Sequence, residues 1–337
     1  MKPSNLSVLE KMHKQKISFS GFPTPLQIMP RLSTVLGGPR LFVKRDDMTD
    51  LSFGGNKARK LEFLFADAKN KGADVVVSVG AVQSNCVCMV ASAARRLGMK
   101  PVLVLVGKAP EVYDGNLLLD KILSADIHFI EEYGPHVEDF MNRLADEFRA
   151  KGHKPYVIPA GASMSSTVPG YALAMQELVN QFNQIGEKLD YVVCACGTGG
   201  TQAGLIFGAK LLDIKTKILS ASVFASNADA SRTIVQLVNG SAELLDLDLS
   251  IVPEEVTVFD DYIKDGYGVL NNEVTGAIKL VAETEGIFLD PVYTGKAMVM
   301  LIDLIKRGYF KEDSNVVFFH TGGFPALFLY RNELGKT

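Results

Sequence analysis

Short apolar runs of strand length alternate with helical patterns along almost the whole chain. This alternation is typical of βαβ units, in which consecutive strands lie parallel in one sheet. Between the runs, apolar residues recur at the spacing of amphipathic helices. The sequence therefore predicts an α/β fold with parallel sheets. The predicted strands are Asp74–Val79, Pro101–Val106, Asp126–Ile130, Pro155–Ile158, Tyr191–Cys196, Lys217–Phe224 and Asn315–Phe319.

Two Gly- or Ser-rich interruptions divide this pattern. They are LSFGG at positions 51–55 and GASMSSTVPG at positions 161–170. Such stretches are typical of loops and of crossings between domains. We therefore expect a small α/β domain over residues 54–165 and a larger domain over residues 1–53 and 166–337.

The composition is that of a compact globular protein. The 337 residues are 47% hydrophobic and 22% charged, which excludes disordered, collagen-like and coiled-coil classes. The formal charge of −3 disfavours a basic surface for nucleic acid. No apolar run reaches the roughly 18 residues of a membrane helix, and the first residues lack the apolar core of a secretory signal. We expect a cytoplasmic protein that binds neither nucleic acid nor membranes.

The four cysteines form two C-x-C pairs, Cys86 with Cys88 and Cys194 with Cys196. So few cysteines in so long a chain do not make a disulfide framework, and structural zinc favours a C-x2-C spacing. We expect small buried thiols and no metal.

Four Gly- or Asn-bearing loops follow the predicted strands or lie close to their ends. They are GGNK at residues 54–57, GAVQSN at 80–85, CGTGGT at 196–201 and TGG at 321–323. Open α/β sheets bind ligands at the carboxyl ends of their strands. The four loops are therefore expected to converge on one pocket.

The CGTGGT loop has the strongest individual signal. It joins a buried strand to a helix expected to begin near Thr201, and its glycines allow backbone N–H groups to surround an anion. Thr198 and Thr201 add hydroxyl donors, so we interpret the loop as a phosphate site. A dinucleotide fingerprint needs glycine at Gln202, and a Walker loop needs glycine at Asp290, so both are disfavoured. A tight turn without a ligand stays the alternative.

Lys57 provides a second group that could bind a phosphorylated ligand. It follows two glycines and Asn56, and it precedes a predicted helix that ends near Gly72. A partly buried lysine near a helix start loses solvation, and its amine becomes neutral enough to attack an aldehyde. A lysine together with a phosphate site predicts pyridoxal 5′-phosphate as the cofactor. For Lys57 alone, a solvated side chain beside Arg59 and Lys60 is the alternative. The apolar face of the helix is expected to consist of Leu61, Leu64, Phe65 and Ala68.

Other catalytic patterns are weaker. GASMS at residues 161–165 misses the G-x-S-x-G nucleophile elbow by one residue, and no H-E-x-x-H metal motif occurs in the sequence. His320 ends a predicted strand, where a hydrogen-bonded structural role is expected. A hydrolase and a metalloprotease are both disfavoured.

Ten motifs occur in a specific order along the chain: FPTPLQ, GGPRLFVKRDD, GGNKARKLEFL, GAVQSN, GNLLLD, PYVIPAG, CGTGGTQAGL, DGYGVLN, EGIFLDPVYTGKAM and HTGGFPALF. Together they resemble the family of 1-aminocyclopropane-1-carboxylate deaminase and D-cysteine desulfhydrase, which are fold type II pyridoxal-phosphate enzymes. The resemblance covers nearly the whole chain. It implies two open, twisted parallel-sheet domains with the cofactor between them, similar to the β subunit of tryptophan synthase. It also implies a homodimer.

The resemblance assigns the cofactor contacts to individual residues. It implies that Lys57 forms a Schiff base with the cofactor and then moves the α-proton of the substrate. It also implies that Asn85 hydrogen-bonds the 3′-oxygen of the cofactor. The residues implied to hold the phosphate are Gly197, Thr198, Gly199, Gly200 and Thr201.

The substrate contacts follow from the same resemblance. Gln83 and Ser84 are expected to face the substrate carboxylate, with Asn85 beside them. Tyr293 corresponds to an aromatic residue near the cofactor ring, and Tyr267 to a second active-site tyrosine. Ser84 and the two tyrosines are expected to orient or protonate the reacting groups. An ordinary core position is the alternative for each tyrosine alone.

Thr294 and Thr321 bear on which reaction of the family is catalysed. In the deaminases, Glu stands at the first position and Leu at the second. A carboxylate near the pyridine nitrogen keeps it protonated, and opening an unactivated cyclopropane needs that stronger electron sink. Two threonines near the cofactor therefore favour β-elimination, in which D-cysteine and water give sulfide, ammonia and pyruvate. 1-Aminocyclopropane-1-carboxylate deaminase is the alternative.

Cys86 and Cys88 depart from the family pattern, which usually has His and Arg at these positions after QSN. GASMSSTVPG likewise replaces a GGSS-like stretch. Both departures lie beside the expected substrate, so elimination from another β-substituted amino acid, such as cysteate or β-chloroalanine, stays open. A protein that binds cofactor or amino acid without efficient catalysis is a further alternative.

Overall fold

The computed structural model describes residues 3–19 and 21–335, and it contains two sheets. The strands of the larger sheet are, in spatial order, β1 (Leu26–Ile28), β2 (Arg40–Lys44), β10 (Asn315–Phe319), β7 (Tyr191–Cys196), β8 (Lys217–Ser222) and β9 (Thr257–Phe259). Those of the smaller sheet are β5 (Asp126–Ile130), β4 (Lys100–Val106), β3 (Val75–Ala81) and β6 (Pro155–Ile158). Neighbouring strands are parallel except for the edge pair β1 and β2. The predicted α/β fold with parallel sheets is confirmed.

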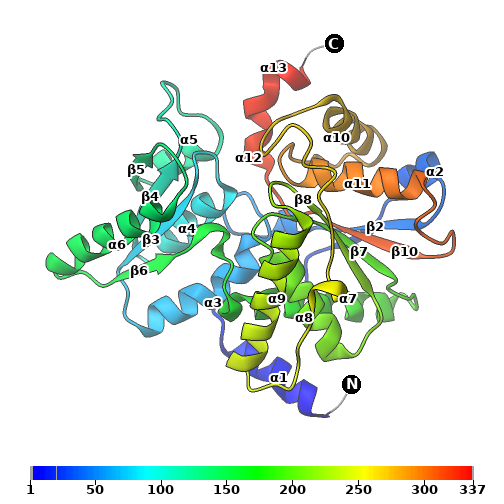
Figure 1. Cartoon of the computed structure of the whole chain (residues 1–337), viewed down its shortest axis with the longest axis horizontal. Coiled ribbons are helices and arrows are strands. Elements are labelled where there is room, and N and C mark those ends of the chain that lie inside the picture. The colour runs from blue at the N-terminus through cyan, green and yellow to red at the C-terminus, as the bar shows by residue number, and fades with distance from the viewer. Residues whose placement is uncertain (1–2, 20, 336–337) are drawn as a thin grey trace.

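Helices surround both sheets, which form two lobes of the molecule (Figure 1). The longer helices are α1 (Pro3–Lys14), α2 (Pro30–Leu36), α3 (Lys57–Asn70), α4 (Asn85–Arg96), α5 (Gly115–Ile122), α6 (Pro135–Ala150), α7 (Val168–Gln184), α8 (Gly200–Leu212), α9 (Asn227–Leu244), α10 (Asn272–Glu285) and α11 (Thr294–Lys306). Two short helices, α12 (Phe324–Leu327) and α13 (Arg331–Leu334), end the described chain. Among the residues that the structure describes, no helix has both the length and the apolar character needed to cross a membrane.

All seven predicted strands are present, with ends that differ from the prediction by at most two residues. Three short strands, β1, β2 and β9, were not predicted. The helix expected after Lys57 is α3, and Gly72 adopts the left-handed conformation just beyond its end. The smaller sheet falls within residues 54–165, while the exact domain bounds stay a prediction.

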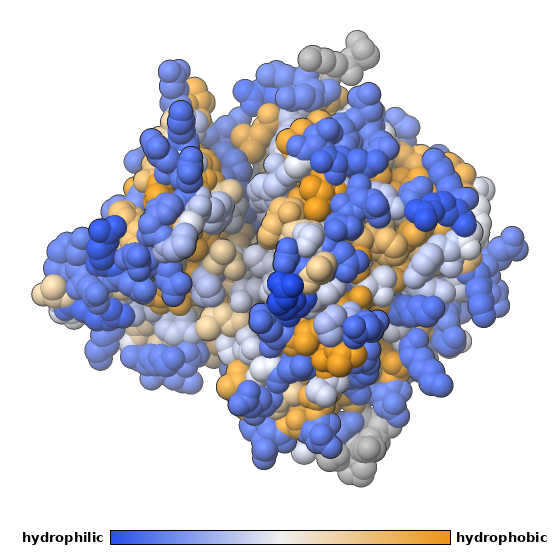
Figure 2. Space-filling view, viewed as in Figure 1, coloured by the Kyte–Doolittle hydropathy of each residue, from blue (hydrophilic) through white to orange (hydrophobic). Residues whose placement is uncertain are grey.

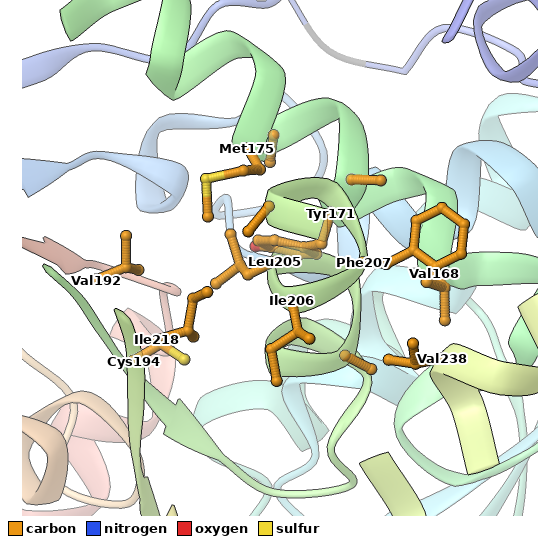
Figure 3. Close-up of a cluster of buried hydrophobic side chains, with 14 of the residues drawn as sticks. Val168, Tyr171, Met175, Val192, Cys194, Leu205, Ile206, Phe207, Ile218 and Val238 are labelled. Carbon is orange, nitrogen blue, oxygen red and sulfur yellow. The ribbon is translucent and has the colours of Figure 1, made fainter. Parts of the chain in front are cut away.

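The main core of the larger lobe surrounds α8 (Figure 3). Leu205 and Ile206 on this helix lie among buried side chains of β7, β8, α7 and α9. Gly204 and Gly208 allow α7 to approach closely, because a Cβ atom at Gly204 would lie 2.3 Å from the Cβ of Tyr171. Burial of each large apolar side chain contributes about 1.5–3 kcal/mol. This packing holds the first turn of α8 rigidly at the carboxyl end of β7.

A buried ion network attaches α3 to α7. Arg59, which is only 3% exposed, pairs with Asp46 at 2.8 Å and with Glu177 at 3.0 Å. The Tyr171 hydroxyl donates a hydrogen bond to Asp46 at 2.6 Å, and Lys44 also pairs with Glu177. Burial acts to raise the pKa of Asp46, but the charge and hydrogen bonds of Arg59 outweigh it and lower the pKa. The network fixes the start of α3, where Lys57 lies.

Candidate active site

A cavity of about 490 Å³ lies between the two sheets, at the carboxyl ends of their strands. Figure 2 shows the surface hollowed between the two lobes. Each of the four predicted loops contributes to the wall, with Lys57, Ser84, Thr198 and Thr321 as one member from each. The expected convergence of the four loops on one pocket is confirmed.

Close backbone contact brings the first and last of these loops together. Gly55 and Gly322 form an antiparallel bridge, and the Asn56 N–H donates to the Thr321 carbonyl at 3.1 Å. A Cβ atom at Gly322 would lie 2.7 Å from the Cα of Gly55, so only glycine allows this approach. The bridge sets the position of Lys57 relative to β10.

Lys57 is the first residue of α3, and its side chain lines the cavity. Burial lowers the pKa of its amine, because a charged group loses solvation there. The neighbouring thiols of Cys86 and Cys196 oppose this effect only partly. A larger fraction of the amine is therefore neutral and able to attack an aldehyde.

The first turn of α8 has the geometry that suits an anion. Gly199 caps the helix with φ +77°, and Gly200 begins it, so backbone N–H groups of this turn face the cavity. A Cβ atom at Gly200 would lie 2.5 Å from the Ser163 Oγ and 2.7 Å from the Lys60 Nζ. Thr201 accepts a hydrogen bond from the Asn56 Nδ2 at 2.9 Å. Gly197 to Thr201 all line the cavity, where the phosphate site was predicted.

Lys60 lies beside this turn and was not predicted as a site residue. It is 1% exposed, and its Nζ donates to the Ser163 Oγ at 3.0 Å. The Ser163 hydroxyl in turn lies 2.7 Å from the Thr198 Oγ1. Burial, followed by repulsion from Lys57, lowers the pKa of Lys60 well below its usual value. A phosphate group beside Lys60 would supply the negative charge that this buried amine lacks.

A second helix start, that of α4, carries Ser84 and Asn85. The Ser84 Oγ caps the helix by accepting the Val87 N–H at 3.3 Å, so its own O–H can donate to a ligand. The Asn85 Oδ1 accepts from the Asn116 Nδ2 at 2.6 Å, which leaves the amide N–H groups of the Asn85 side chain to donate to a ligand in the cavity. The Ser84 hydroxyl and the Asn85 amide are donors that suit an acceptor such as a substrate carboxylate or a cofactor ring oxygen.

Aromatic side chains form the outer part of the cavity. The hydroxyls of Tyr267 and Tyr293 lie 2.6 Å apart, and their rings meet edge to face at 6.0 Å. Burial, together with Tyr267, raises the pKa of Tyr293 well above its usual value, so its hydroxyl keeps its proton. Tyr133 and Phe224 also line the cavity and were not predicted. Tyr133 lies just beyond the predicted strand Asp126–Ile130, and Phe224 ends the predicted strand Lys217–Phe224, at the carboxyl ends where ligand contacts gather.

Two predicted site residues do not line the cavity. The Gln83 side chain bonds to the start of α5, accepting the Asn116 N–H at 2.9 Å and donating to the Asp114 carbonyl at 3.1 Å. The Thr294 hydroxyl donates to the Asp290 Oδ1 at 2.7 Å within the first turn of α11. Thr321 does line the cavity.

His320 and the cysteines have structural surroundings. The imidazole of His320 is buried and hydrogen-bonded to the Phe288 carbonyl at 2.9 Å, as expected for a structural role. All four cysteines are buried and form no disulfide. Cys86 lines the cavity, whereas Cys88 does not and lies near Ser52 and Asp120. Burial raises the pKa of both thiols, which makes them poor nucleophiles.

The donor set fits pyridoxal 5′-phosphate. A buried amine with lowered pKa suits its aldehyde, and the α8 turn with Lys60 suits its phosphate. Any side chain at Gly200 would fill the space between Ser163 and Lys60. Asn85 supplies an amide donor for the ring oxygen.

Comparison with known proteins agrees with this interpretation. The family described as "Pyridoxal-phosphate dependent enzyme" matches residues 17–322. The D-cysteine desulfhydrase of Klebsiella pneumoniae (strain 342) is 41% identical over 324 residues, which are 95% of this chain and 97% of that protein. A protein of Pyrococcus abyssi (strain GE5 / Orsay), provisionally named 1-aminocyclopropane-1-carboxylate deaminase, is 39% identical over 320 residues, covering 95% and 94% of the two chains.

A solved structure shares the whole architecture. The crystal structure of an ACC deaminase homologue matches with a TM-score of 0.90 and 37% identity, over 99% of both chains. The chain therefore belongs to the family of pyridoxal-phosphate-dependent enzymes, with the type II fold and pyridoxal 5′-phosphate as its cofactor.

Proposed function

We propose that this enzyme catalyses β-elimination from D-cysteine, which with water gives sulfide, ammonia and pyruvate. One observation carries the choice of reaction: among the described residues that line the cavity, none is a carboxylic acid. Thr321, near the expected pyridine nitrogen, offers only a hydroxyl. A carboxylate there would strengthen the electron sink that opening a cyclopropane needs. Expelling a thiolate from Cβ requires only removal of the α-proton and a good leaving group.

The cavity residues can perform each proton transfer of this reaction. Pyridoxal phosphate, when bound, withdraws electrons from the Cα of an attached amino acid. The Lys57 Nζ takes the α-proton, since burial lowers the pKa of this amine and leaves more of it in the neutral form that accepts a proton. The Cβ–S bond breaks and sulfur leaves with the electron pair. The hydrogen-bonded pair Tyr267 and Tyr293 supplies a proton to the departing sulfur.

Ser84 and the start of α4 hold the substrate carboxylate in this proposal. The Ser84 O–H and the N–H groups of the first turn of α4 converge on the cavity beside Lys57. A helix N-terminus with a hydroxyl donor binds an anion without a paired cation. The carboxylate position then sets which face of Cα lies toward the Lys57 amine.

The products identify the reaction. The purified holoenzyme is incubated with D-cysteine, and sulfide, ammonia and pyruvate are measured. Equal amounts of the three products support the proposal. 2-Oxobutyrate from 1-aminocyclopropane-1-carboxylate, without pyruvate from D-cysteine, would establish the deaminase instead. A visible absorbance that shifts with D-cysteine but yields no product would indicate binding without turnover.

The homodimer and the cytoplasmic location expected from the sequence stay predictions. A cluster of aromatic rings supports the homodimer. The ring centroid of Phe324 lies 6.5 Å from that of Phe288 and 5.3 Å from that of Phe328. Phe288 and Phe328 are more than half exposed, as is common at subunit interfaces. Light scattering of the holoenzyme and of a Phe328→Ser variant would test for the dimer and for this surface.

A further inference from the structure

We propose that the preferred substrates are D-cysteine derivatives that carry an uncharged aromatic group on sulfur. Tyr133, Phe224 and Tyr267, here called the aromatic wall, would receive that group. The inference rests on the proposed β-elimination and specifies its substrate class.

The aromatic wall is assembled from three separate loops. Tyr133 lies between β5 and α6, Phe224 follows β8, and Tyr267 lies between β9 and α10. All three line the cavity. The rings of Phe224 and Tyr267 meet edge to face at 6.1 Å, and a Cβ atom at Gly197 would lie 3.8 Å from Phe224 Cε1. The wall therefore extends outward from the phosphate loop toward the mouth of the cavity.

The aromatic wall is exposed although it lines a cavity. Tyr133 is 58% exposed, Phe224 51% and Tyr267 42%. Clustered aromatic rings with uncovered faces are the surfaces that ligands bury with most gain in free energy. D-Cysteine has no heavy atom beyond its sulfur and would leave these faces in water. A second ring on the sulfur could pack against them.

Beyond the cofactor end, the cavity offers no cationic partner to an anionic substituent. The described lining residues include no Asp, Glu, Arg or His, and the basic side chains among them are those of Lys57 and Lys60, whose pKa burial lowers. Lys57 is the residue that would hold the cofactor aldehyde, and Lys60 donates to Ser163 beside the loop that would hold the phosphate. A sulfonate or carboxylate group packed against these ring faces would lose solvation without gaining a cationic partner, and the faces themselves carry negative potential. The wall therefore favours a neutral group over an anionic one.

The reaction balances for any such substituent R. R–S–CH₂–CH(NH₃⁺)–COO⁻ and water give R–SH, pyruvate and ammonium. The Cβ–S bond breaks with the electron pair on sulfur, which takes up a proton as R–SH. Water then replaces the amino group, so no oxidant or reductant is needed.

Two substrates isolate the contribution of the aromatic ring. S-Benzyl-D-cysteine and S-ethyl-D-cysteine differ by the ring, and because the benzyl thiolate is the less basic and better leaving group, binding of the ring is read from KM and from the change of the benzyl-to-ethyl ratio in the variants. We expect a kcat/KM about tenfold or more higher for the benzyl compound, chiefly through a lower KM, because the ring buries additional apolar surface. S-Carboxymethyl-D-cysteine should be poorer than the ethyl compound. Pyruvate formation by the holoenzyme is followed with lactate dehydrogenase.

Substitutions in the aromatic wall test whether it causes the preference for the benzyl compound. Phe224→Ala and Tyr133→Ala should each reduce the benzyl-to-ethyl ratio of kcat/KM about threefold to tenfold, as loss of one aromatic contact predicts. Tyr309→Ala is the matched control, because Tyr309 is 40% exposed and lies in another ring cluster that does not line the cavity. Its ratio should match that of the unmodified enzyme.

Two results would overturn the inference separately from the proposed function. If D-cysteine gives pyruvate but the benzyl compound is no better than the ethyl compound, elimination stands and the substrate class is wrong. The substrate class is also wrong if the benzyl-to-ethyl ratio of kcat/KM is unchanged in Phe224→Ala and in Tyr133→Ala. If no cysteine derivative gives pyruvate, the proposed elimination itself fails.

Discussion

Asp120 makes the stability of this protein depend on pH near neutrality. This carboxyl group on α5 is 1% exposed, and its Oδ1 has no hydrogen-bond partner among the described residues. Burial raises the pKa of Asp120 to about 7, and a hydrogen bond with Cys88 on α4 only partly opposes this effect. Asp120→Asn keeps the shape of the protonated acid and removes its titration.

The sign follows from the protons bound in each state. Between the unfolded pKa of 3.8 and the folded pKa of about 7, the folded chain holds the Asp120 proton and the unfolded chain does not. The free energy of unfolding therefore falls as pH rises through this window, and the loss is complete above pH 7. Each pH unit costs about 1.4 kcal/mol, so raising the pH from 5 to 8 removes about 3 kcal/mol.

Urea unfolding of the holoenzyme measures this effect. The free energies of the unmodified protein and of Asp120→Asn are compared from pH 5 to pH 8 at a fixed excess of pyridoxal phosphate. The difference between the two should change by about 3 kcal/mol in favour of the variant as pH rises. Asp248→Asn is the control, because Asp248 is exposed and its substitution should leave the pH profile unchanged. Parallel profiles for the unmodified protein and Asp120→Asn would refute the reasoning.

Three further changes test the site and its support. Lys57→Ala should abolish both turnover and the visible absorbance of the bound cofactor; retention of both would contradict its role as the cofactor-binding lysine. Arg59→Met leaves the buried Asp46 carboxylate without its cationic partner, so the free energy of unfolding measured in urea should fall by about 3–5 kcal/mol. A loss below about 1 kcal/mol would mean that the ion network contributes little to stability. Gly200→Ala should weaken binding of pyridoxal phosphate in a fluorescence titration, because the new Cβ would contact Lys60 at 2.7 Å. Gly276→Ala, with open space around it, should bind the cofactor normally.

The sheets and the cofactor end of the cavity could be predicted from local sequence. Central parallel strands such as β7 are buried on both faces, so they are continuous apolar runs that need no knowledge of their neighbours. The phosphate loop that follows β7 shows its function in its glycines, because backbone N–H groups can surround an anion only where side chains are absent. Once these strands are parallel, their carboxyl ends meet at one edge.

What could not be predicted depends on partners distant in the sequence. β2 begins with Arg40 and ends with Lys44, so its apolar run is only three residues long and too short to predict a strand from the sequence. Lys44 is buried because it pairs with Glu177, which is 133 residues away. Lys60 is buried because it donates to Ser163, 103 residues away. Ser163 lies in the stretch at residues 161–170, which the sequence identified as a crossing between domains and, through the family resemblance, as a neighbour of the substrate, but not as a partner of Lys60. Charged residues suggest a solvated surface until such a partner is known.

The cavity therefore has two parts with different constraints. Its inner part consists of two helix starts, α4 and α8, together with Lys57 and Lys60, and the cofactor dictates these residues through its aldehyde and phosphate. Its outer part consists of side chains beyond β5, β8 and β9, and no shared cofactor chemistry restricts them. Tyr133 and Phe224 can differ from those of a relative without any loss of cofactor binding. Identity of about 40% with a D-cysteine desulfhydrase thus supports the cofactor and the reaction class more strongly than the substituent on sulfur.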